Sequence, residues 1–353
     1  MARAFQDGLQ LSMSIRRRPG AKWPLRLVTA LLACVPAHAC CPLVRVRDAT
    51  FQISPEVYLN YTEAGQGEEV VVALHGFGAS LDTWREIRPA LARHRRVFMP
   101  DLLGFGLSAH PPGFKYTIRE QTDAIVAFLK FVHLRTGVHG ITLVGHSYGG
   151  SVALAACLLL KDQHLPLVGS LVLIDALAFP QAMRFPLYIN VLRVPVVNWF
   201  VLNLVPRGLR ARYVLRHVFY RRYLVTGERV CRYAQFYDLP GAHRALIDTA
   251  RQLGDRRQLD GFVSRIPEID TPTLIIWGAH DRLIPQRQAG MLHNAMAASR
   301  EVALLDTGHV PHEELPEATF CLIDNFLDAH AAHCDGLASF ETTWSRSTPM
   351  PSE

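Results

Sequence analysis

The chain has 353 residues, 49% of them hydrophobic and 19% charged, so it can form one large globular domain or two modest ones. The formal charge of +6 and pI near 9.0 are compatible with nucleic acid, but the basic, aromatic-interleaved motifs of RNA readers and a helix-turn-helix pattern are both absent from the sequence. We therefore expect no nucleic-acid partner. A basic surface that meets anionic lipid explains the charge at least as well.

The N-terminal residues 1–42 have the layout of an export signal. A basic run at 16–22 precedes a mostly apolar run at 25–35, and Ala37-His38-Ala39 offers a cleavage site before Cys40. Leu31-Leu32-Ala33-Cys34 instead resembles the lipobox of bacterial lipoproteins, in which case Cys34 carries the lipid. An uncleaved anchor ranks lower, because spanning a bilayer takes roughly 20 apolar residues. A basic tail without a targeting role is the remaining alternative. We expect an exported protein that is periplasmic, secreted or lipid-anchored to the cell envelope.

The cysteines do not form a recognisable metal-binding pattern, and no metal or cofactor is expected from them. Export would permit disulfides, but the spacings leave the pairing open. Cys157 lies in an apolar helical segment and is expected in the core. The seven cysteines are Cys34, Cys40, Cys41, Cys157, Cys231, Cys321 and Cys334.

From residue 43 onward the sequence predicts an α/β fold. Short strands at 43–63 precede a series of near-continuous apolar runs, which is how strands read when helices cover both faces of a mostly parallel sheet. Helices are expected between the runs, at about 83–92, from a capping box at Thr117 and Glu120, after residue 151, and at about 315–329. The apolar runs are 70–74, 96–99, 141–144, 171–174, 273–277 and 302–305.

The alternation breaks once, between residues 178 and 266. No convincing parallel strand is found there, and 185–205 is rich in large apolar residues. Residues 181–260 then carry fourteen arginines against five acidic residues, a net charge of +9. We interpret 178–266 as a helical cap inserted between the two parts of one core, residues 43–177 and 267–330. The remaining residues, 331–353, are polar and are expected to be a disordered tail.

The stretch Gly145-His146-Ser147-Tyr148-Gly149 joins the apolar run 141–144 to a helix-like segment. A serine flanked by glycines at such a junction can be held on a tight turn with its hydroxyl projecting outward. Ser147 is therefore a candidate nucleophile. The motif alone is weak, because serine and glycine also occupy ordinary loops.

A serine nucleophile needs a base, and an acid that orients the base. Asp281 follows the run 273–277 and His309 follows the run 302–305, so both are expected at the edge of the sheet where Ser147 lies. Asp175, after 171–174, is the alternative acid, and His312 is the alternative base.

The order Ser147, Asp281, His309 is that of the α/β-hydrolase family, and three further segments resemble its motifs. Leu74-His75-Gly76-Phe77-Gly78 resembles the oxyanion loop, residues 101–108 resemble the D-x-x-G-x-G-x-S turn, and residues 308–316 resemble the G-H-x-P-x-x-E-x-P segment. The resemblance covers about residues 55–330. It implies a serine esterase-like or lipase-like member, with an oxyanion hole made by the backbone N–H groups of Phe77 and Tyr148 and no cofactor.

The same resemblance implies roles for other side chains. His75 and His146 are expected to shape the site through hydrogen bonds, and Trp277 to lie in the core. Trp84, Phe77 and Tyr148 are candidate pocket residues.

We expect hydrolysis of a carboxylic ester, with a small-molecule or lipid-like substrate that has an apolar chain, and association with a membrane surface. A serine nucleophile argues against dehalogenase or epoxide hydrolase chemistry but leaves a C–C bond hydrolase, perhydrolase, thioesterase or acyltransferase open. A ligand-binding pseudoenzyme is the non-enzyme alternative. The sequence leaves the oligomeric state undetermined.

Overall fold

The computed structural model describes residues 49–179, 186–253 and 261–327, all within one compact unit of residues 41–353. The expected export signal at 1–42 and the expected tail at 331–353 lie outside the described residues. Those two predictions therefore stay predictions.

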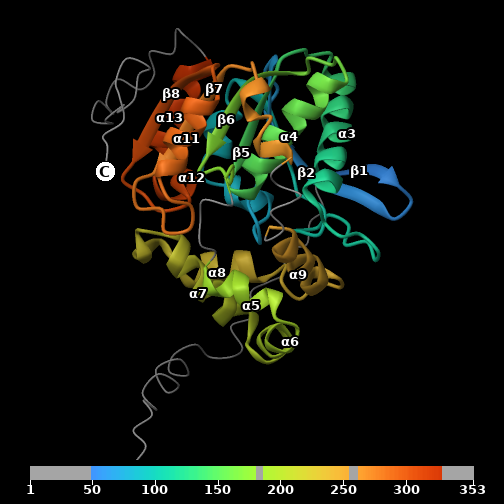
Figure 1. Cartoon of the computed structure of the whole chain (residues 1–353), viewed down its shortest axis with the longest axis vertical. Helices are drawn as coiled ribbons and strands as arrows, with labels where there is room; N and C mark the ends of the chain where they lie inside the picture. The colour runs from blue at the N-terminus through green and yellow to red at the C-terminus, as the bar shows by residue number, and fades with distance from the viewer. Residues whose placement is uncertain (1–48, 180–185, 254–260, 328–353) are drawn as a thin grey trace, which may run out of the picture. The chain divides into compact units, whose positions relative to one another are not determined.

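An eight-stranded sheet forms the centre of the molecule, in the order β1-β2-β4-β3-β5-β6-β7-β8. Strands β3 to β8 pair in parallel, whereas β1 pairs antiparallel with β2, and β2 antiparallel with β4 (Figure 1). The predicted mostly parallel sheet is confirmed. The strands are β1 Ala49–Ser54, β2 Val57–Ala64, β3 Glu69–Leu74, β4 Arg95–Pro100, β5 Ile141–His146, β6 Val168–Ile174, β7 Thr273–Gly278 and β8 Ser299–Leu305.

Both faces of the sheet are buried, which explains why its strands read as near-continuous apolar runs. On β3, Val72 belongs to a hydrophobic cluster shared with α3 (Ile118–Thr136), α4 (Tyr148–Asp162) and α11 (Arg287–Ala295). Its neighbour Val71 belongs to a second cluster, shared with α13 (Pro316–Leu327). Successive side chains of a strand point to opposite faces, so one apolar run serves both clusters.

The helices follow the predicted pattern, with one exception. The capping box that begins α3 is present, with both Thr117 and Glu120 making their reciprocal contacts. The single helix expected at 83–92 is instead a 3-10 turn, η1 (Leu81–Trp84), and a one-turn helix, α2 (Arg88–Leu91). Pro89 accounts for the break, because it has no N–H to donate to the preceding turn, whereas a proline is tolerated in the first turn of a new helix such as α2.

A helical segment lies between β6 and β7, and we call its described residues, 186–253 and 261–269, the insertion. No strand occurs in it, as the sequence predicts. Figure 1 places its helices beyond the carboxyl ends of the parallel strands. Its elements are α5 Leu187–Arg193, α6 Pro195–Leu204, α7 Arg207–Val218, η3 Arg222–Leu224, α8 Gly227–Ala234, α9 Ala242–Gln252 and η4 Ile266–Glu268.

Candidate active site

Ser147 occupies the sharp turn between β5 and α4, with the positive backbone dihedral φ of 52°. Residues other than glycine seldom adopt a positive φ, and such a conformation persists only where the surrounding structure enforces it. The enforcement is steric: a Cβ on Gly149 would lie 2.4 Å from the carbonyl oxygen of Leu74. Only glycine allows α4 to begin this close to β3, so the serine side chain is held at the end of the sheet.

The three side chains expected at this edge of the sheet are in contact. His309 Nε2 lies 2.9 Å from Ser147 Oγ, and His309 Nδ1 lies 2.7 Å from Asp281 Oδ2. Asp281 Oδ1 accepts hydrogen bonds from the amides of Leu283 and Ile284, at 2.7 and 3.1 Å. The Asp281 carboxylate is thereby fixed by its own loop, so it can accept a hydrogen bond from the Nδ1–H of His309. Nε2 is left free to accept the serine proton.

Asp175, the alternative acid, lies beside this pair without contacting the base nitrogen. Its Oδ1 accepts a 3.0 Å hydrogen bond from the Gly278 amide, and its buried Oδ2 has no hydrogen-bond partner among the described residues. Burial, and then the charge of Asp281, raise the pKa of Asp175 well above its ordinary value. The neutral acid is therefore the favoured form of Asp175.

Two backbone amides are free beside Ser147. Tyr148 is the first residue of α4, where an N–H has no partner inside its helix. Among the described residues, neither its amide nor that of Phe77 donates a backbone hydrogen bond. The loop that carries Phe77 lies against the serine, since a Cβ on Gly76 would be 3.0 Å from Ser147 Cβ. The geometry fits the expected oxyanion hole.

Asp101 and His75 hold the neighbouring turn. The buried Asp101 carboxylate accepts hydrogen bonds from the Leu81 and Leu107 amides at 2.7 and 2.9 Å, while its burial raises its pKa to about 6. His75 Nδ1 donates to the Gly76 carbonyl at 2.8 Å, and His75 Nε2 accepts from the Leu102 amide at 2.9 Å. His75 therefore ties the oxyanion loop to this turn as a neutral ring.

Behind the base lies a buried stack of aromatic rings. The ring centroid of His146 is 4.9 Å from that of His309 and 4.6 Å from that of His312, and His312 is 4.6 Å from Trp84. His146 Nε2 donates to the His309 carbonyl at 2.7 Å. Desolvation lowers the pKa of His146 well below the ordinary value and that of His312 to about 3. A neutral stack adds no positive charge next to the base.

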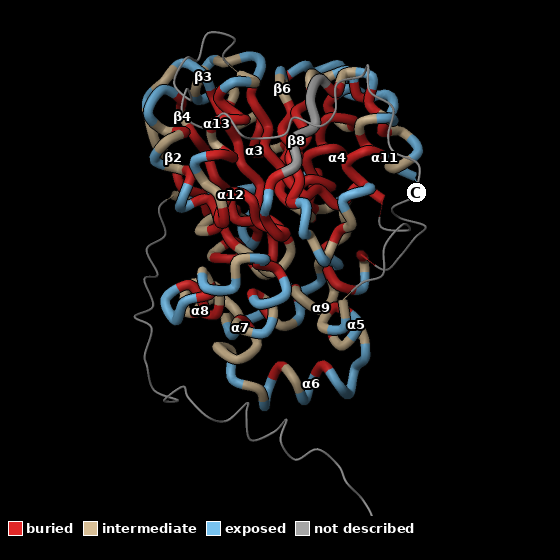
Figure 2. Tube along the Cα trace, turned by 90° about the vertical axis from the view of Figure 1, so that its left-hand side faces the viewer, coloured by how far each residue is buried: buried red, intermediate tan, exposed pale blue. Residues whose placement is uncertain are grey.

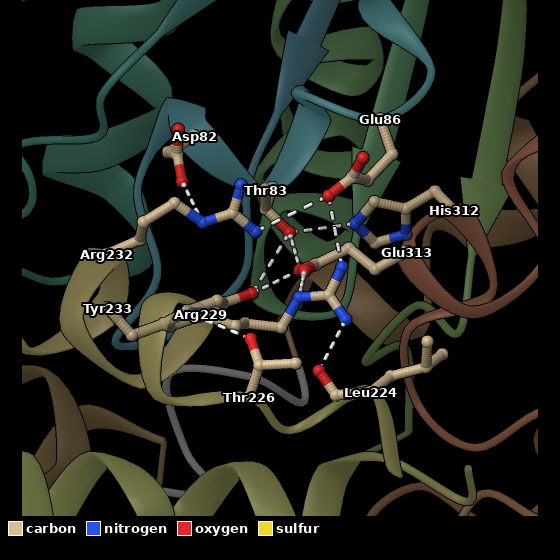
Figure 3. A network of polar contacts seen from close by, with 10 residues as sticks. All are labelled: Asp82, Thr83, Glu86, Leu224, Thr226, Arg229, Arg232, Tyr233, His312 and Glu313. Carbon is tan, nitrogen blue, oxygen red and sulfur yellow. Dashed lines mark hydrogen bonds and ion pairs between the residues drawn. The ribbon is translucent and has the colours of Figure 1, made fainter. Parts of the chain in front are cut away.

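His312 connects the stack to the insertion through the polar network in Figure 3. Its Nε2 lies 2.9 Å from Thr83 Oγ1, which donates to the buried carboxylate of Glu313 at 2.7 Å. Tyr233 of α8 donates its hydroxyl to the same carboxylate, and Arg229 of α8 lies 3.3 Å from it. The Arg229 guanidinium also bonds Glu86 at 3.0 Å. The insertion is thus joined to the core through a buried acid.

A second connection leads directly to the base. The His309 amide donates to the carbonyl of Val218, the last residue of α7, at 2.9 Å. The Glu314 carboxylate accepts from the amides of Gly308, Tyr220 and Arg221, at 2.8, 3.1 and 2.7 Å. The loop of His309 is therefore built partly from the insertion. Our sequence interpretation gave Glu314 no role, although it is the glutamate of the G-H-x-P-x-x-E-x-P segment.

The expected pocket residues do not all face the site. Trp84 is fully buried against His312, so it offers no accessible face to a substrate and its assignment to the pocket is wrong. The Tyr148 side chain is also buried, in the sheet–helix core, and only its amide is placed for chemistry. Phe77 is half-buried and packs against insertion residues. Trp277 is a core residue as predicted, and donates its ring N–H to the Ile284 carbonyl.

Sequence reasoning missed two insertion side chains that approach the site. Tyr188 of α5 and Leu246 of α9 pack against the same apolar cluster of the insertion as Phe77 does. Leu246 Cδ1 would be 3.8 Å from a Cβ on Gly78, which places it above the oxyanion loop. Burial first, then Tyr237 and the charge of Asp281, raise the pKa of the Tyr188 hydroxyl. Helical periodicity alone could not show which residues of the insertion face the core.

One cluster in the described part of the chain has metal-ligand geometry, and it is the site itself. Ligand atoms of Asp175, Asp281 and His309 lie within 4.8 Å of one another. Both ring nitrogens of His309 are already engaged, by Asp281 and Ser147. The triad accounts for this cluster without an ion.

A serine on a strained strand-to-helix turn, a histidine and an aspartate at later strand ends, and a mostly parallel sheet define a hydrolase of the α/β class. The chain belongs to the alpha/beta hydrolase family, whose sequence profile matches residues 71–320. It is therefore an enzyme, a hydrolase.

Relatives within the family differ in what their names describe. An uncharacterized hydrolase, YugF, of Bacillus subtilis is 26% identical over 74% of this chain and 90% of its own length. The 2-hydroxy-6-oxo-2,4-heptadienoate hydrolase of Pseudomonas putida is 29% identical over 76% of this chain and 92% of its own length. The crystal structure of a membrane phospholipase A superposes with a TM-score of 0.60 and 25% identity, covering 80% of this chain and 85% of that one.

Proposed function

We propose that this enzyme hydrolyses carboxylic esters by acyl transfer to Ser147. The observation that carries the proposal is the continuous hydrogen-bonded series from Ser147 through His309 to Asp281, at 2.9 and 2.7 Å. His309 Nε2 takes the serine proton while Oγ attacks the ester carbonyl carbon. The tetrahedral intermediate then expels the alcohol, which receives the proton from His309. Water attacks the acyl-enzyme by the same proton route and releases the acid and free Ser147.

The free amides of Phe77 and Tyr148 would stabilise the oxyanion of both tetrahedral intermediates. Such a donor is already oriented before charge develops, and its loss typically costs about 2.7 to 4 kcal/mol of barrier. The proposal also gives a reason for the close approach of Gly76 to Ser147, because a larger residue would push the Phe77 amide away.

We propose further that the insertion acts as a cap and that the substrate carries an apolar chain. In support, Phe77 packs against an apolar cluster in which Ile189, Leu192 and Leu202 are buried. Arg229, a buried arginine of the insertion, is already paired with Glu86 and Glu313. An apolar acyl or alcohol chain fits such surroundings better than a charged one.

Two measurements test this function. Ser147→Ala should lower turnover of p-nitrophenyl esters by at least about 10³-fold, and a fluorophosphonate should label Ser147 in the unmodified enzyme. Near-wild-type turnover in the variant would sink the mechanism, and absence of labelling would favour a ligand-binding protein. For the apolar chain, octanoyl esters should be cleaved with higher kcat/KM than acetyl esters; a strong preference for acetyl would refute it.

A second candidate is C–C bond hydrolysis of a dienoate. It is favoured by relatives whose names describe that substrate class, the heptadienoate hydrolase and a 2-hydroxymuconate semialdehyde hydrolase that is 29% identical over 79% of this chain. The same triad could serve both reactions. Turnover of a 2-hydroxy-6-oxo-dienoate can be monitored by the loss of its absorbance. If this substrate is turned over and no ester in the panel is, the enzyme is a C–C bond hydrolase.

We also infer export to an oxidising compartment, where the protein is secreted, periplasmic or lipid-anchored. The export layout of residues 1–42 supports this, and so do the disulfide bonds of Cys231 and Cys321, because disulfides persist mainly outside the reducing cytosol. Mass spectrometry of the protein from its native host should find the N-terminus at Cys34 or Cys40. A protein that still begins at Met1, or at Met13 as an alternative start of translation, would contradict cleavage.

A further inference from the structure

The bend between α5 and α6 exposes an unusual apolar surface. Half of the fourteen large hydrophobic residues exposed in the described structure lie within residues 187–204. Both figures place α6 at the end of the insertion far from the sheet, and Figure 2 shows exposed positions along it. We call these seven residues the α6 surface: Leu187, Val194, Val196, Val197, Trp199, Phe200 and Leu204.

The rest of α6 fixes this surface in place. Asn198 and Leu202 are buried, and Asn198 donates its amide to the Leu192 carbonyl at 2.8 Å. The one polar side chain at the exposed end, Asn203, donates to the Trp199 carbonyl at 2.7 Å. The helix contains no charged residue. Its outward face is therefore rigid and apolar, with its exposed amide satisfied by the helix itself.

The segment that carries the α6 surface, together with the helix after it, is rich in positive charge. Residues 186–227 contain seven arginines and no aspartate or glutamate. Within the described chain, the guanidinium groups of four of these arginines make no hydrogen bond or ion pair, whereas that of Arg210 is paired with Asp238. The unpaired arginines are Arg207, Arg212, Arg216 and Arg222. An apolar helix followed in the chain by a helix with unpaired arginines is complementary to a membrane that presents acyl chains beneath anionic headgroups.

The length of α6 shows whether this helix could cross a membrane or would lie in the plane of its surface. None of the described helices is long and apolar enough to span a bilayer by itself, and α5 and α6 pass the test only as a pair bent by 111°. A helix of ten residues is about 15 Å long, about half of the hydrocarbon thickness. The geometry suits a helix in the plane of the interface.

We propose that the α6 surface docks this enzyme on an anionic lipid bilayer, with Trp199 and Phe200 among the acyl chains and the arginines of α7 at the headgroups. This inference goes beyond the proposed function, because it concerns binding to a surface and holds whichever bond the triad cleaves.

Vesicle flotation of the full-length protein tests the inference. The protein should float with vesicles of phosphatidylcholine and phosphatidylglycerol. The double variant Trp199→Ser/Phe200→Ser should bind about a hundredfold more weakly, roughly tenfold for each aromatic side chain withdrawn from lipid. Leu134→Ser, at an 82% exposed leucine of α3, is the matched control and should bind as the unmodified protein does. Residues 1–48 are common to all variants, so a difference in flotation between two variants reports the substituted side chains.

Charge and depth give two further readouts. Arg212→Gln and Arg216→Gln should each weaken binding to anionic vesicles about fivefold. Brominated acyl chains should quench the fluorescence of the unmodified protein more than that of Trp199→Phe, which keeps an apolar ring and should float normally.

Three outcomes would overturn the inference. They are failure of the unmodified protein to float, equal flotation of the Trp199→Ser/Phe200→Ser variant, and a solution dimer that this variant converts to a monomer while neither form binds vesicles. Labelling of Ser147 by a fluorophosphonate serves as the folding check for every variant. It reports the ester chemistry separately from lipid binding.

Discussion

Asp175 and Asp281 lie side by side at the ends of β6 and β7, yet only Asp281 bonds the Nδ1 atom of His309. The two carboxyl groups are buried close together, so ionising both of them would be unfavourable because the two negative charges would repel each other. The loop of Asp281 supplies two N–H donors to its carboxylate, whereas Asp175 receives one, from Gly278. This difference makes Asp281 the better-placed acceptor for the Nδ1–H of His309, while Asp175 is the member whose pKa is raised.

The first prediction separates the two acids. Asp281→Asn should lower kcat/KM for an ester by about 10⁴-fold, the usual cost of leaving the histidine in the wrong tautomer. Asp175→Asn should stay within about tenfold of the unmodified enzyme, because an amide replaces a neutral acid of the same shape and can still accept from Gly278. Steady-state kinetics on one p-nitrophenyl ester measures both. The reverse order of effects would assign the acid to Asp175.

The second prediction concerns pH and stability. Burial lowers the pKa of His75 to about 4 and that of His312 to about 3, from an ordinary 6.5. Below pH 6.5 the unfolded chain takes up protons at these rings and the folded chain does not, so stability is lost as pH falls. For each of the two rings, the free energy of unfolding should fall by about 2 kcal/mol between pH 6.5 and about pH 5.

Urea unfolding at several pH values measures that loss. His312→Gln keeps a donor for Thr83 and cannot titrate, so its stability should fall less steeply with acid than that of the unmodified protein. Parallel curves for the two proteins would show that His312 does not stay neutral in the folded state.

The third prediction concerns the buried join between insertion and core. Arg229→Leu should lower the free energy of unfolding by about 3 kcal/mol, because it strands the Glu313 carboxylate in the interior. Glu313→Gln in the same chain should restore part of the loss. Arg265→Leu is the matched control: its ion pairs with Asp162 and Glu268 lie at the surface, where such pairs are worth little. Additive losses in the double variant would mean that Arg229 and Glu313 are not coupled.

The fourth prediction concerns chain length. Leu246→Ala should lower kcat/KM for an octanoyl ester about tenfold and leave that for an acetyl ester unchanged, because only the longer chain would reach the side chain above Gly78. An equal effect on both esters would mean that the acyl chain of the substrate does not contact Leu246.

Much of the core and site follows from local sequence signals. The buried strands were recognisable because both faces of the sheet are covered, and Ser147, Asp281 and His309 because each stands just beyond such a strand. These signals are short-range, and parallel topology converts them into proximity.

The remaining features depend on contacts without a local pattern. Thr83 and Glu313 are 230 positions apart, and Arg229 and Glu86 are 143 apart. Nothing in either segment indicates its partner. The misassignment of Trp84 has the same origin, because a tryptophan near a site motif looks the same whether its ring faces the substrate or His312.

The hydrogen bond from the His309 amide to Val218 has a consequence for how this enzyme can be re-engineered. Exchange of α5 to α9 for the corresponding helices of a relative would remove the acceptor of the base's own amide and two of the three donors to Glu314. The helices that would set the substrate range therefore cannot be exchanged without also changing the alignment of His309. A functional chimera would need the 218–221 strip and the 308–314 loop transplanted together.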